Sequence, residues 1–486
     1  MNTTRNNLFV KRLIIFLIMI CTAYLSACQS ENSPPRQHSS LHIDSTTASD
    51  TDSSITSEDN AKAESDNSES DEYYNHGTIY DVNMQPIISS EINSSDEPYR
   101  KMGVRYTALS NIICDQSCGL DSVFSSILRE KNPTKVNIDD SIGCSVQLTL
   151  NADMTRKIYD RLNNEGITGS VVVLRDDGSV ASMVSCPTYD ANKLHDDPGY
   201  EATLTKKGTF TNRTLQQAAP GSTFKIISEV VADINGIDTA IDEGMMLVDG
   251  VPLKNWDWGI NPDYPVTTNR EDSFIRSSNL FFAKVFAYAG TKNVTRILAD
   301  YFMFGDNIVI ECDFGTLSNS LSISTKDDLY RSGFSQAKVR TTPMYLAALT
   351  RQGVYGTFLK PYILKNKIDT KTKEVIENTE QKTELSAIPV KYREGIRKCM
   401  KSAGQCLNGI NVPDGYSFYA KTGTADITDT SSFLYITGAL VSNNSDHGFI
   451  VTMQIQNPEE LGIQYASGSA YIYNDILKII CGEESF

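Results

Sequence analysis

Pro220-Gly221-Ser222-Thr223-Phe224-Lys225 opens the segment of this sequence that decides the fold. The apolar residues that follow, up to Ile234, have the spacing of a buried helix that ends near Gly236. Ser222 then lies at the start of the helix, and Lys225 lies on the same face. A serine hydroxyl is a weak nucleophile unless a base takes its proton, and a lysine serves when burial or a second cation lowers its pKa. The pattern predicts Ser222 as a nucleophile that Lys225 activates.

Ser-x-x-Lys alone is a weak signal, because the chain contains a second copy at Ser335-Gln336-Ala337-Lys338. This copy follows Gly333-Phe334 and runs quickly into Thr341-Thr342-Pro343. That is a turn-like setting with no long apolar helix behind it. We therefore expect the nucleophile at Ser222 and not at Ser335.

Two further motifs carry polar groups next to apolar segments. Ser277-Ser278-Asn279 lies inside a segment of helix-compatible spacing, Glu271 to Ala289, and its hydroxyl and amide could relay a proton or hold a substrate amide. Lys421-Thr422-Gly423-Thr424 ends a strand-like stretch that begins at Tyr416, and could bind a carboxylate. The alternatives are a helix cap or turn for the first motif and a charged edge strand with a glycine bulge for the second.

The three motifs, in this order, resemble the signature of penicillin-binding proteins and serine β-lactamases. Val146 to Asn151 looks like the family's first strand, and Gly169 to Asn192 like its next hairpin and loop. Upstream, Gly77-Thr78-Ile79-Tyr80-Asp81 resembles the pedestal of the class B, transpeptidase-only branch. His76 stands where that branch usually has an arginine.

The resemblance implies a mixed α/β (α+β type) fold in which helices sandwich an antiparallel sheet. It also implies no metal and no organic cofactor. Its substrates would be peptidoglycan stem peptides that end in D-alanyl-D-alanine, which β-lactams mimic, and its oxyanion hole would be the N–H groups of Ser222 and Thr424. Carried onto this chain, the catalytic residues are Ser222, Lys225, Ser277, Asn279 and Lys421, and the substrate-binding residues are Thr422, Gly423 and Thr424.

The first residues read as an export signal. Basic residues precede an apolar run from Leu13 to Leu25, which is short for a bilayer span, and Leu25-Ser26-Ala27-Cys28 resembles a lipobox. We expect cleavage before Cys28, a lipid on its sulfur, and a protein anchored to the extracytoplasmic face of the membrane. A plain signal peptide, with Cys28 incidental, is the alternative. The predicted domains are a signal peptide at 1–27, an acidic tether at 28–75, a short pedestal-like region at 76–140 and a transpeptidase domain at 141–486.

Composition narrows the function classes. The formal net charge is −16, and the tether is rich in Ser, Asp and Glu, so nucleic acid is a poor partner. Only His195 and His447 lie deep in the predicted folded part, which disfavours a Ser-His-Asp hydrolase and a histidine-based zinc site. Eight cysteines beyond Cys28 permit disulfides, with Cys114/Cys118 and Cys399/Cys406 nearest in sequence, or are buried free thiols. We expect the tryptophans, Trp256 and Trp258, to pack in the core rather than line the cleft.

Three functions fit these motifs. D,D-transpeptidation, the cross-linking of stem peptides through a serine acyl-enzyme, is the one we favour. Hydrolysis, as in a D,D-carboxypeptidase or a β-lactamase, needs a positioned water, for which no obvious base is seen. A non-catalytic lipoprotein that senses β-lactams or wall peptides is the third. Partners in cell-wall synthesis are possible, but the short pedestal puts a docking surface for a glycosyltransferase in doubt.

Overall fold

The computed structural model describes residues 75–92, 98–113, 119–134, 142–197, 199–204, 208–306, 308–336, 338–380, 382–428 and 431–483. All of them belong to the structural unit that runs from Ser70 to Phe486. The predicted signal peptide, the predicted lipid-attachment residue Cys28 and nearly all of the predicted tether lie outside the described residues. Within the ranges given above, no helix has the length and apolar character that a membrane span requires.

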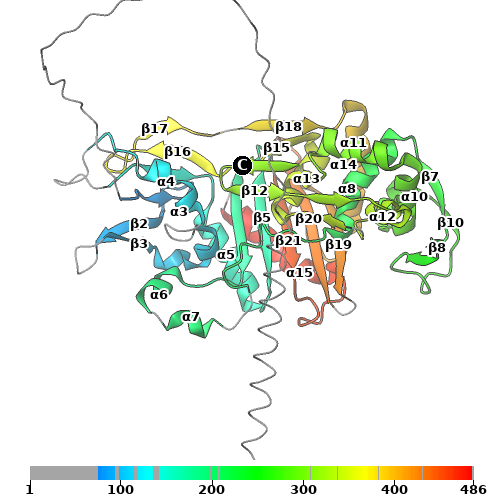
Figure 1. Cartoon of the computed structure of the whole chain (residues 1–486), viewed down its shortest axis with the longest axis horizontal. Coiled ribbons are helices and arrows are strands. Elements are labelled where there is room, and N and C mark those ends of the chain that lie inside the picture. Colours follow the sequence, from blue (N-terminus) through cyan, green and yellow to red (C-terminus); the bar gives the residue numbers. More distant parts are fainter. Residues whose placement is uncertain are drawn as a thin grey trace, which may run out of the picture. The chain divides into compact units, whose positions relative to one another are not determined.

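A five-stranded antiparallel sheet, the core sheet, has the strand order β19-β20-β21-β5-β6 (Figure 1). Its strands are β5 (Gly169–Arg175), β6 (Val180–Cys186), β19 (Tyr416–Thr428), β20 (Ser431–Ser442) and β21 (Gly448–Ile455). Successive side chains of a strand point to opposite faces. Val171 and Val173 of β5 therefore pack in one apolar cluster, and Val172 and Leu174 pack in another. Both faces of β5 and β21 are buried, which explains why these two strands are rich in apolar residues.

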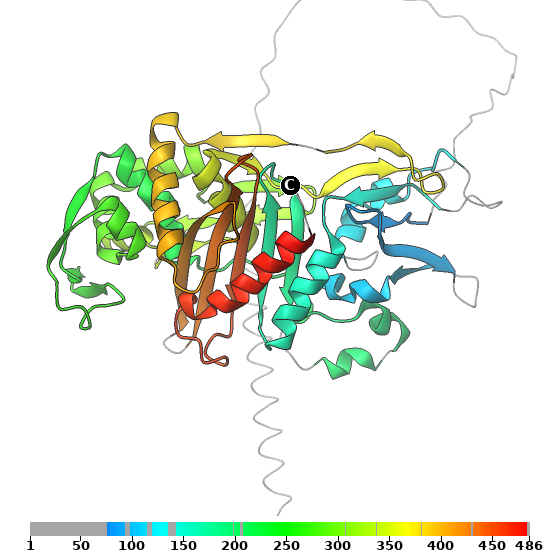
Figure 2. The same ribbon diagram turned by 180° about the vertical axis from the view of Figure 1, so that it is seen from behind.

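Helices cover both faces of the core sheet (Figure 2). On one face, α5 (Ala152–Asn164) packs against α15 (Ala470–Glu483). On the other face, α13 (Pro343–Tyr355) lies across β20, β21 and β5, and packs in turn against α8 (Lys225–Ile234) and α14 (Val390–Cys406). The predicted fold, an antiparallel sheet between helical layers, is confirmed. α8 lies wholly within the apolar interior up to its last turn, as its sequence predicts.

A second, six-stranded sheet has the order β17-β16-β4-β1-β2-β3. Its members are β1 (Ile79–Tyr80), β2 (Pro86–Ile92), β3 (Pro98–Met102), β4 (Ser145–Leu148), β16 (Leu364–Ile368) and β17 (Val375–Asn378). β1 and β4 pair in parallel, and the other pairs are antiparallel. The sheet takes strands from both sides of the boundary predicted near residue 140. β4, the strand expected at Val146, belongs to this sheet and not to the core sheet.

A buried ion cluster ties the N-terminal strands to the short helices that follow them. The Arg100 guanidinium contacts the Asp121 carboxylate at 2.5 Å, and His76 Nδ1 lies 3.1 Å from the same carboxylate. All three residues are buried. A buried carboxylate is tolerated only when it is paired and hydrogen-bonded. Arg100 and His76 together supply that pairing.

The remaining elements are short helices and two-stranded sheets around these layers. The paired strands are β7 with β10, β8 with β9, β11 with β12, β13 with β14, and β15 with β18. Their bounds are β7 (Thr239–Asp242), β8 (Met245–Val248), β9 (Val251–Lys254), β10 (Val266–Asn269), β11 (Val309–Cys312), β12 (Gly315–Ser318), β13 (Ser320–Ser322), β14 (Lys338–Arg340), β15 (Thr357–Lys360) and β18 (Thr383–Ala387). The helices are η1 (Val104–Leu109), α2 (Ser110–Ile113), α3 (Gly119–Val123), α4 (Ser125–Leu128), α6 (Ala191–Asp196), α7 (Tyr200–Thr203), η2 (Gly221–Phe224), α9 (Arg270–Ile275), α10 (Asn279–Ala289), α11 (Thr291–Phe302), α12 (Lys326–Ser332) and η3 (Ala466–Ser469).

Candidate active site

Ser222 and Lys225 lie side by side at the start of α8. Lys225 Nζ is 3.0 Å from Ser222 Oγ, as the spacing of the two residues predicts. Ser222 occupies a 3-10 turn, η2, directly before the α-helix rather than the first α-helical turn. This turn needs Gly221, whose φ is +57°, because a Cβ there would lie 2.4 Å from the Thr424 carbonyl oxygen. The glycine therefore lets the turn that carries Ser222 pack directly against β19.

The second motif lies at a break between two helices. The sequence predicts helical spacing from Glu271 to Ala289, but α9 ends at Ile275 and α10 begins at Asn279. Between them Ser277 has a φ of +59°, in the left-handed region that a serine seldom adopts. The break turns Ser277 and Asn279 toward Lys225. Lys225 Nζ lies 2.7 Å from the Ser277 carbonyl oxygen, 3.1 Å from Ser277 Oγ and 2.8 Å from Asn279 Oδ1.

The third motif approaches from the edge of the core sheet. Lys421, on β19, donates from Nζ to Ser277 Oγ at 3.1 Å and to the Thr422 carbonyl oxygen at 3.0 Å. A Cβ on Gly423 would lie 3.0 Å from the Pro220 carbonyl oxygen, so this glycine also permits close packing of β19 on η2. Thr422 is half-buried and Thr424 is exposed on the same strand. The structure thus brings the side chains of Ser222, Lys225, Ser277, Asn279 and Lys421 into one cluster.

Burial sets the protonation of the two lysines. It lowers the pKa of Lys225 well below 10.5, and the neighbouring charge of Lys421 lowers that pKa further. Burial also lowers the pKa of Lys421 to about 7. A neutral Lys225 amine has two N–H donors and one lone pair. The Ser277 carbonyl and Asn279 Oδ1 are suited to accept the two N–H groups, which leaves the lone pair for a hydroxyl proton.

Two residues that the sequence did not single out hold the turn at Ser277. Ser278 Oγ donates to Asp242 Oδ2 at 2.6 Å, and Asn255 Oδ1 accepts from the Asn279 N–H at 2.7 Å. Asp242, Asn255 and Ser278 are all buried. The two partners come from β7 and from the end of the β8–β9 hairpin, tens of residues upstream, so no local spacing could reveal them.

The second Ser-x-x-Lys copy, Ser335 to Lys338, does not lie at the start of a helix as Ser222 and Lys225 do. Ser335 lies in a turn after α12 with a φ of +70°, and Lys338 is exposed on β14. No helix places these two side chains on one face.

The predicted core packing of the tryptophans is wrong. Trp256 is 62 % exposed and Trp258 is 40 % exposed. Trp256 Nε1 donates to the Arg276 carbonyl oxygen at 3.1 Å, beside the Ser277 turn. This hydrogen bond and a ring contact with Tyr465 hold the Trp256 indole at the surface next to the cluster.

The cysteines that the structure describes are free thiols. Cys399 is buried, Cys406 is exposed, and neither forms a disulfide; Cys114 and Cys118 lie outside the described residues. In the ranges that the structure describes, no three His, Cys, Asp or Glu side chains gather as a metal ion would require.

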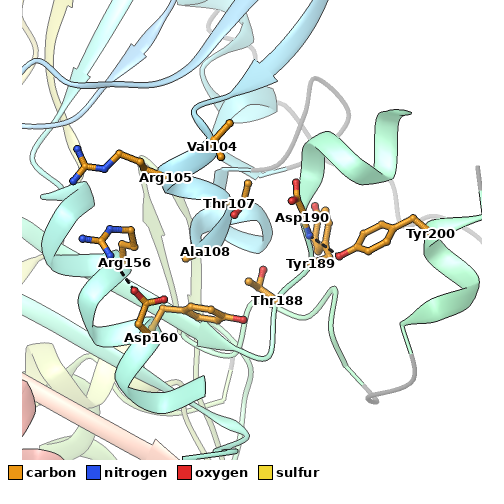
Figure 3. A pocket seen from close by; sticks show the side chains of 11 residues that line it. Val104, Arg105, Thr107, Ala108, Arg156, Asp160, Thr188, Tyr189, Asp190 and Tyr200 are labelled. Atoms are coloured by element: carbon orange, nitrogen blue, oxygen red, sulfur yellow. Dashed lines mark hydrogen bonds and ion pairs between the residues drawn. The ribbon is translucent and has the colours of Figure 1, made fainter. Parts of the chain in front are cut away.

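A cavity of about 650 Å³ lies elsewhere, between η1, α5 and the segment that follows β6 (Figure 3). Tyr159, Tyr189 and Tyr200 line it, and none of the five clustered side chains does. β6 and β19 are opposite edges of the core sheet. Four strand spacings, about 19 Å, separate β6 from the strand that carries Lys421. We place the candidate active site at Ser222 because the reactive groups converge there.

Comparison with known proteins points to one family. The profile of the penicillin binding protein transpeptidase domain matches residues 169–478, which is more than half of the chain. The chain is 25% identical over 344 residues to the peptidoglycan D,D-transpeptidase MrdA of Haemophilus influenzae, a match that covers 65% of this chain and 52% of that protein. It is 26% identical over 300 residues to the stage V sporulation protein D of Bacillus subtilis, covering 58% and 44% respectively. The chain spans about half the length of these curated relatives.

Solved structures share the fold. The D,D-transpeptidase domain of a peptidoglycan glycosyltransferase from Eggerthella lenta superposes with a TM-score of 0.70 at 18% identity, covering 84% of this chain and 99% of that domain. Penicillin-binding protein A from M. tuberculosis, solved as an acyl-enzyme complex, gives a TM-score of 0.73 at 18% identity with the same coverage. At this identity the likeness establishes the architecture alone.

Proposed function

Because the chain belongs to the penicillin-binding protein transpeptidase family, we propose that it is a serine D,D-transpeptidase of peptidoglycan, with Ser222 as its nucleophile. The observation that carries the proposal is the 3.0 Å contact between Lys225 Nζ and Ser222 Oγ, in a site that lowers the pKa of that amine. A neutral amine at hydrogen-bond distance is what a serine needs in order to react at neutral pH.

In the acylation step, Ser222 Oγ attacks the carbonyl carbon of the penultimate D-alanine of a stem peptide. Its proton passes to Lys225 Nζ as the carbon–oxygen bond forms. The N–H groups of Ser222 and Thr424 would stabilise the negative charge on the carbonyl oxygen. The close approach of Gly221 to the Thr424 backbone supports this oxyanion hole, because it brings the backbone of the Ser222 turn next to the backbone of β19.

Collapse of the tetrahedral intermediate breaks the peptide bond. The departing D-alanine amine takes a proton, and Ser277 Oγ, which lies 3.1 Å from both lysine amines, is placed to relay it. Asn279 would hold the substrate amide. An acceptor amine from a neighbouring peptide then attacks the ester, gives its proton to the same base and restores the Ser222 hydroxyl.

The terminal carboxylate of the substrate would bind at β19. Lys421 supplies positive charge there, and the hydroxyls of Thr422 and Thr424 supply hydrogen bonds. The pKa of about 7 that burial gives Lys421 would rise when an anion binds beside it, so substrate binding itself favours the charged form. A β-lactam carries a carboxylate and a reactive amide, so it would acylate Ser222 in the same pose.

The same proposal covers location and domain organisation. The protein would be anchored to the extracytoplasmic membrane face by a lipid on Cys28, with the residues up to about 75 as a tether that lets the enzyme reach nearby peptidoglycan. Residues 76–140 would contribute a short pedestal and residues 141–486 the catalytic domain. Metabolic labelling with a radioactive fatty acid tests the anchor, because Cys28→Ser should abolish the label.

The decisive experiment uses a fluorescent penicillin, followed by a D-alanyl-D-alanine stem-peptide donor and a D-amino acid acceptor. We expect a covalent label that Ser222→Ala abolishes, together with an exchanged peptide product. Ser335→Ala is the matched control, because it removes the serine of the second Ser-x-x-Lys copy, and it should label normally.

Other results of this experiment would indicate a different function or a different nucleophile. Rapid loss of label with hydrolysed drug would indicate a β-lactamase, and hydrolysis of the donor without exchange a D,D-carboxypeptidase. Stable label without any peptide turnover would indicate a sensor. Label that survives Ser222→Ala and disappears in Ser335→Ala would show that the nucleophile is wrongly assigned.

A further inference from the structure

The turn between α9 and α10, which carries Ser277, has a strained backbone. Ser277 has a φ of +59°, and a non-glycine residue held in that region costs about 1–3 kcal/mol. Such a conformation persists only when its surroundings hold it. Straightening the turn would continue the helix through Ser277 and would turn its hydroxyl and carbonyl away from Lys225.

The Asp242 carboxylate holds this turn in place through hydrogen bonds. Asp242 Oδ2 accepts the Ser278 hydroxyl at 2.6 Å, and Oδ1 accepts the Gly244 N–H at 2.9 Å. The Asn255 amide nitrogen lies 2.9 Å from both oxygens of the same carboxylate. Asp242 is only 2 % exposed, so it has no access to water that could replace these partners.

Asn255 extends the anchor to the next residues. While its nitrogen donates to Asp242, its Oδ1 accepts the N–H groups of Asn279 at 2.7 Å and Leu280 at 3.1 Å. The Asn279 amide in turn donates to the Lys254 carbonyl oxygen at 2.9 Å, which directs Asn279 Oδ1 to Lys225. The orientation of both side-chain amides is therefore fixed, because the Asp242 carboxylate and the Lys254 carbonyl can only accept hydrogen bonds.

We infer that Asp242 is a positioning residue for acylation: through Ser278 and Asn255 it holds the strained turn in which Ser277 and Asn279 face the Lys225 amine. The inference rests on the proposed function and adds to it a residue that lies outside the three motifs. Asp242 does not touch Ser222, so its effect on the reaction passes through the turn and through its charge.

The charge of Asp242 also acts directly on the Lys225 amine. Among the residues that the structure describes, the charged groups that act on Lys225 are Lys421 on β19, which lowers its pKa, and Asp242 on β7, which raises it. The uncharged surroundings are Ser222, Ser277, Asn279 and the rings of Phe282 and Phe334. Removing the Asp242 charge should therefore lower the pKa of Lys225 and make its proton easier to release.

The test compares three variants by their rates of penicillin acylation across pH. Asp242→Asn removes the charge, and it replaces with an amide nitrogen one of the two oxygens that accept from Ser278 and Gly244. We expect its plateau rate to fall at least about tenfold, as misplaced reacting groups do, and the acid limb of its profile to move to lower pH. Ser278→Ala removes the contact and keeps the charge, so its rate should fall while its acid limb stays in place. Glu243→Gln is the matched control, because that carboxylate is exposed and pairs with Lys284.

A second measurement does not depend on activity. The titration of Lys225 can be followed by NMR in protein with ¹³Cε-labelled lysine, with the Lys225 signal assigned from Lys225→Arg. Its midpoint should move to lower pH in Asp242→Asn and stay near the wild-type position in Ser278→Ala and Glu243→Gln. Wild-type protein that is never labelled at Ser222 would end the proposed function, while this titration would still show whether the Asp242 charge acts on Lys225.

Three results would overturn the inference. They are an acid limb and a Lys225 midpoint that Asp242→Asn leaves unchanged, a wild-type acylation rate in that variant, and an equal loss of rate in Glu243→Gln. Should Asp242→Asn fail to fold by circular dichroism, Ser278→Ala decides the positioning role. A wild-type rate in that variant would refute it.

Discussion

Replacing Lys421 with methionine should make the protein more stable at neutral pH while it destroys the site. Burial lowers the pKa of Lys421 from 10.5 to about 7, so the folded protein binds its proton more weakly than the unfolded chain does. Between pH 7 and 10.5 the unfolded chain therefore carries more protons, and stability rises with pH across that window. Methionine keeps a similar length of apolar side chain and has no proton to lose.

The magnitude follows from the two pKa values. At about 1.4 kcal/mol for each pH unit, the difference between 10.5 and about 7 is worth on the order of 5 kcal/mol below pH 7. Between pH 7 and pH 10 the wild-type protein should regain about 3 kcal/mol of this. The charge of Lys421 also lowers the pKa of Lys225, so removing Lys421 lets Lys225 keep its proton more easily in the folded state. This second effect also stabilises the variant relative to the wild type.

Urea unfolding followed by tryptophan fluorescence, at several pH values from 7 to 10, measures this directly. The informative quantity is the difference in free energy of unfolding between Lys421→Met and the wild type, because titrating groups that Lys421 does not influence cancel in it. That difference should shrink by about 3 kcal/mol as the pH rises. The lost hydrogen bonds to Ser277 and Thr422 shift the whole curve and leave its slope alone. Lys382→Met is the control, because Lys382 is exposed. Parallel pH curves for Lys421→Met and the wild type would refute the electrostatics proposed for the site.

Three further outcomes are expected. Gly221→Ala should slow penicillin acylation by at least about a hundredfold, because its Cβ would lie 2.4 Å from the Thr424 carbonyl oxygen; a wild-type labelling rate would contradict the close packing of η2 on β19. Burial raises the pKa of Glu229 to about 7, so the stability that the protonated carboxyl contributes is present below pH 4.5 and is lost as the pH rises through 7. Glutamine does not titrate, so the free energy of unfolding of Glu229→Gln should fall by up to about 3 kcal/mol less than that of the wild type over this range. The Tm of the variant should accordingly fall less between pH 5 and pH 8. Asp121→Ala leaves Arg100 buried without its carboxylate and should cost about 3–5 kcal/mol in urea unfolding, while the folded fraction still labels at the wild-type rate.

The three motifs were predictable because each one is local. Helical periodicity alone places Lys225 beside Ser222, and a run of strand-forming residues alone places Lys421 on a strand. What joins the motifs is their order along the chain, which resembles the signature of penicillin-binding proteins and serine β-lactamases. Carried onto this chain, that resemblance named the five side chains of the cluster, although they lie on three separate segments.

The break between α9 and α10 was not predictable from the same reasoning. Apolar residues at helical spacing continue from Phe274 to Phe281, so local propensity favours one uninterrupted helix. Contacts from Asp242 and Asn255 override that propensity, and they come from segments whose own sequence has no visible relation to the motif. Trp256 is misjudged for a related reason, because a hydrogen bond at the turn holds at the surface a side chain whose size favours burial.

His76 departs from the family pattern, and the fold gives it a buried partner that the sequence does not reveal. The resemblance sets an arginine where this chain has His76, and the sequence alone does not show which group the imidazole contacts. The physical requirement, however, belongs to the buried carboxylate of Asp121, which needs a cation and hydrogen-bond donors from any direction. Arg100 reaches it from β3, and the imidazole of His76 fills the remaining position at 3.1 Å. No local spacing in the sequence reveals this cluster, because the two groups that contact the carboxylate lie 45 and 21 residues away from Asp121 in the chain.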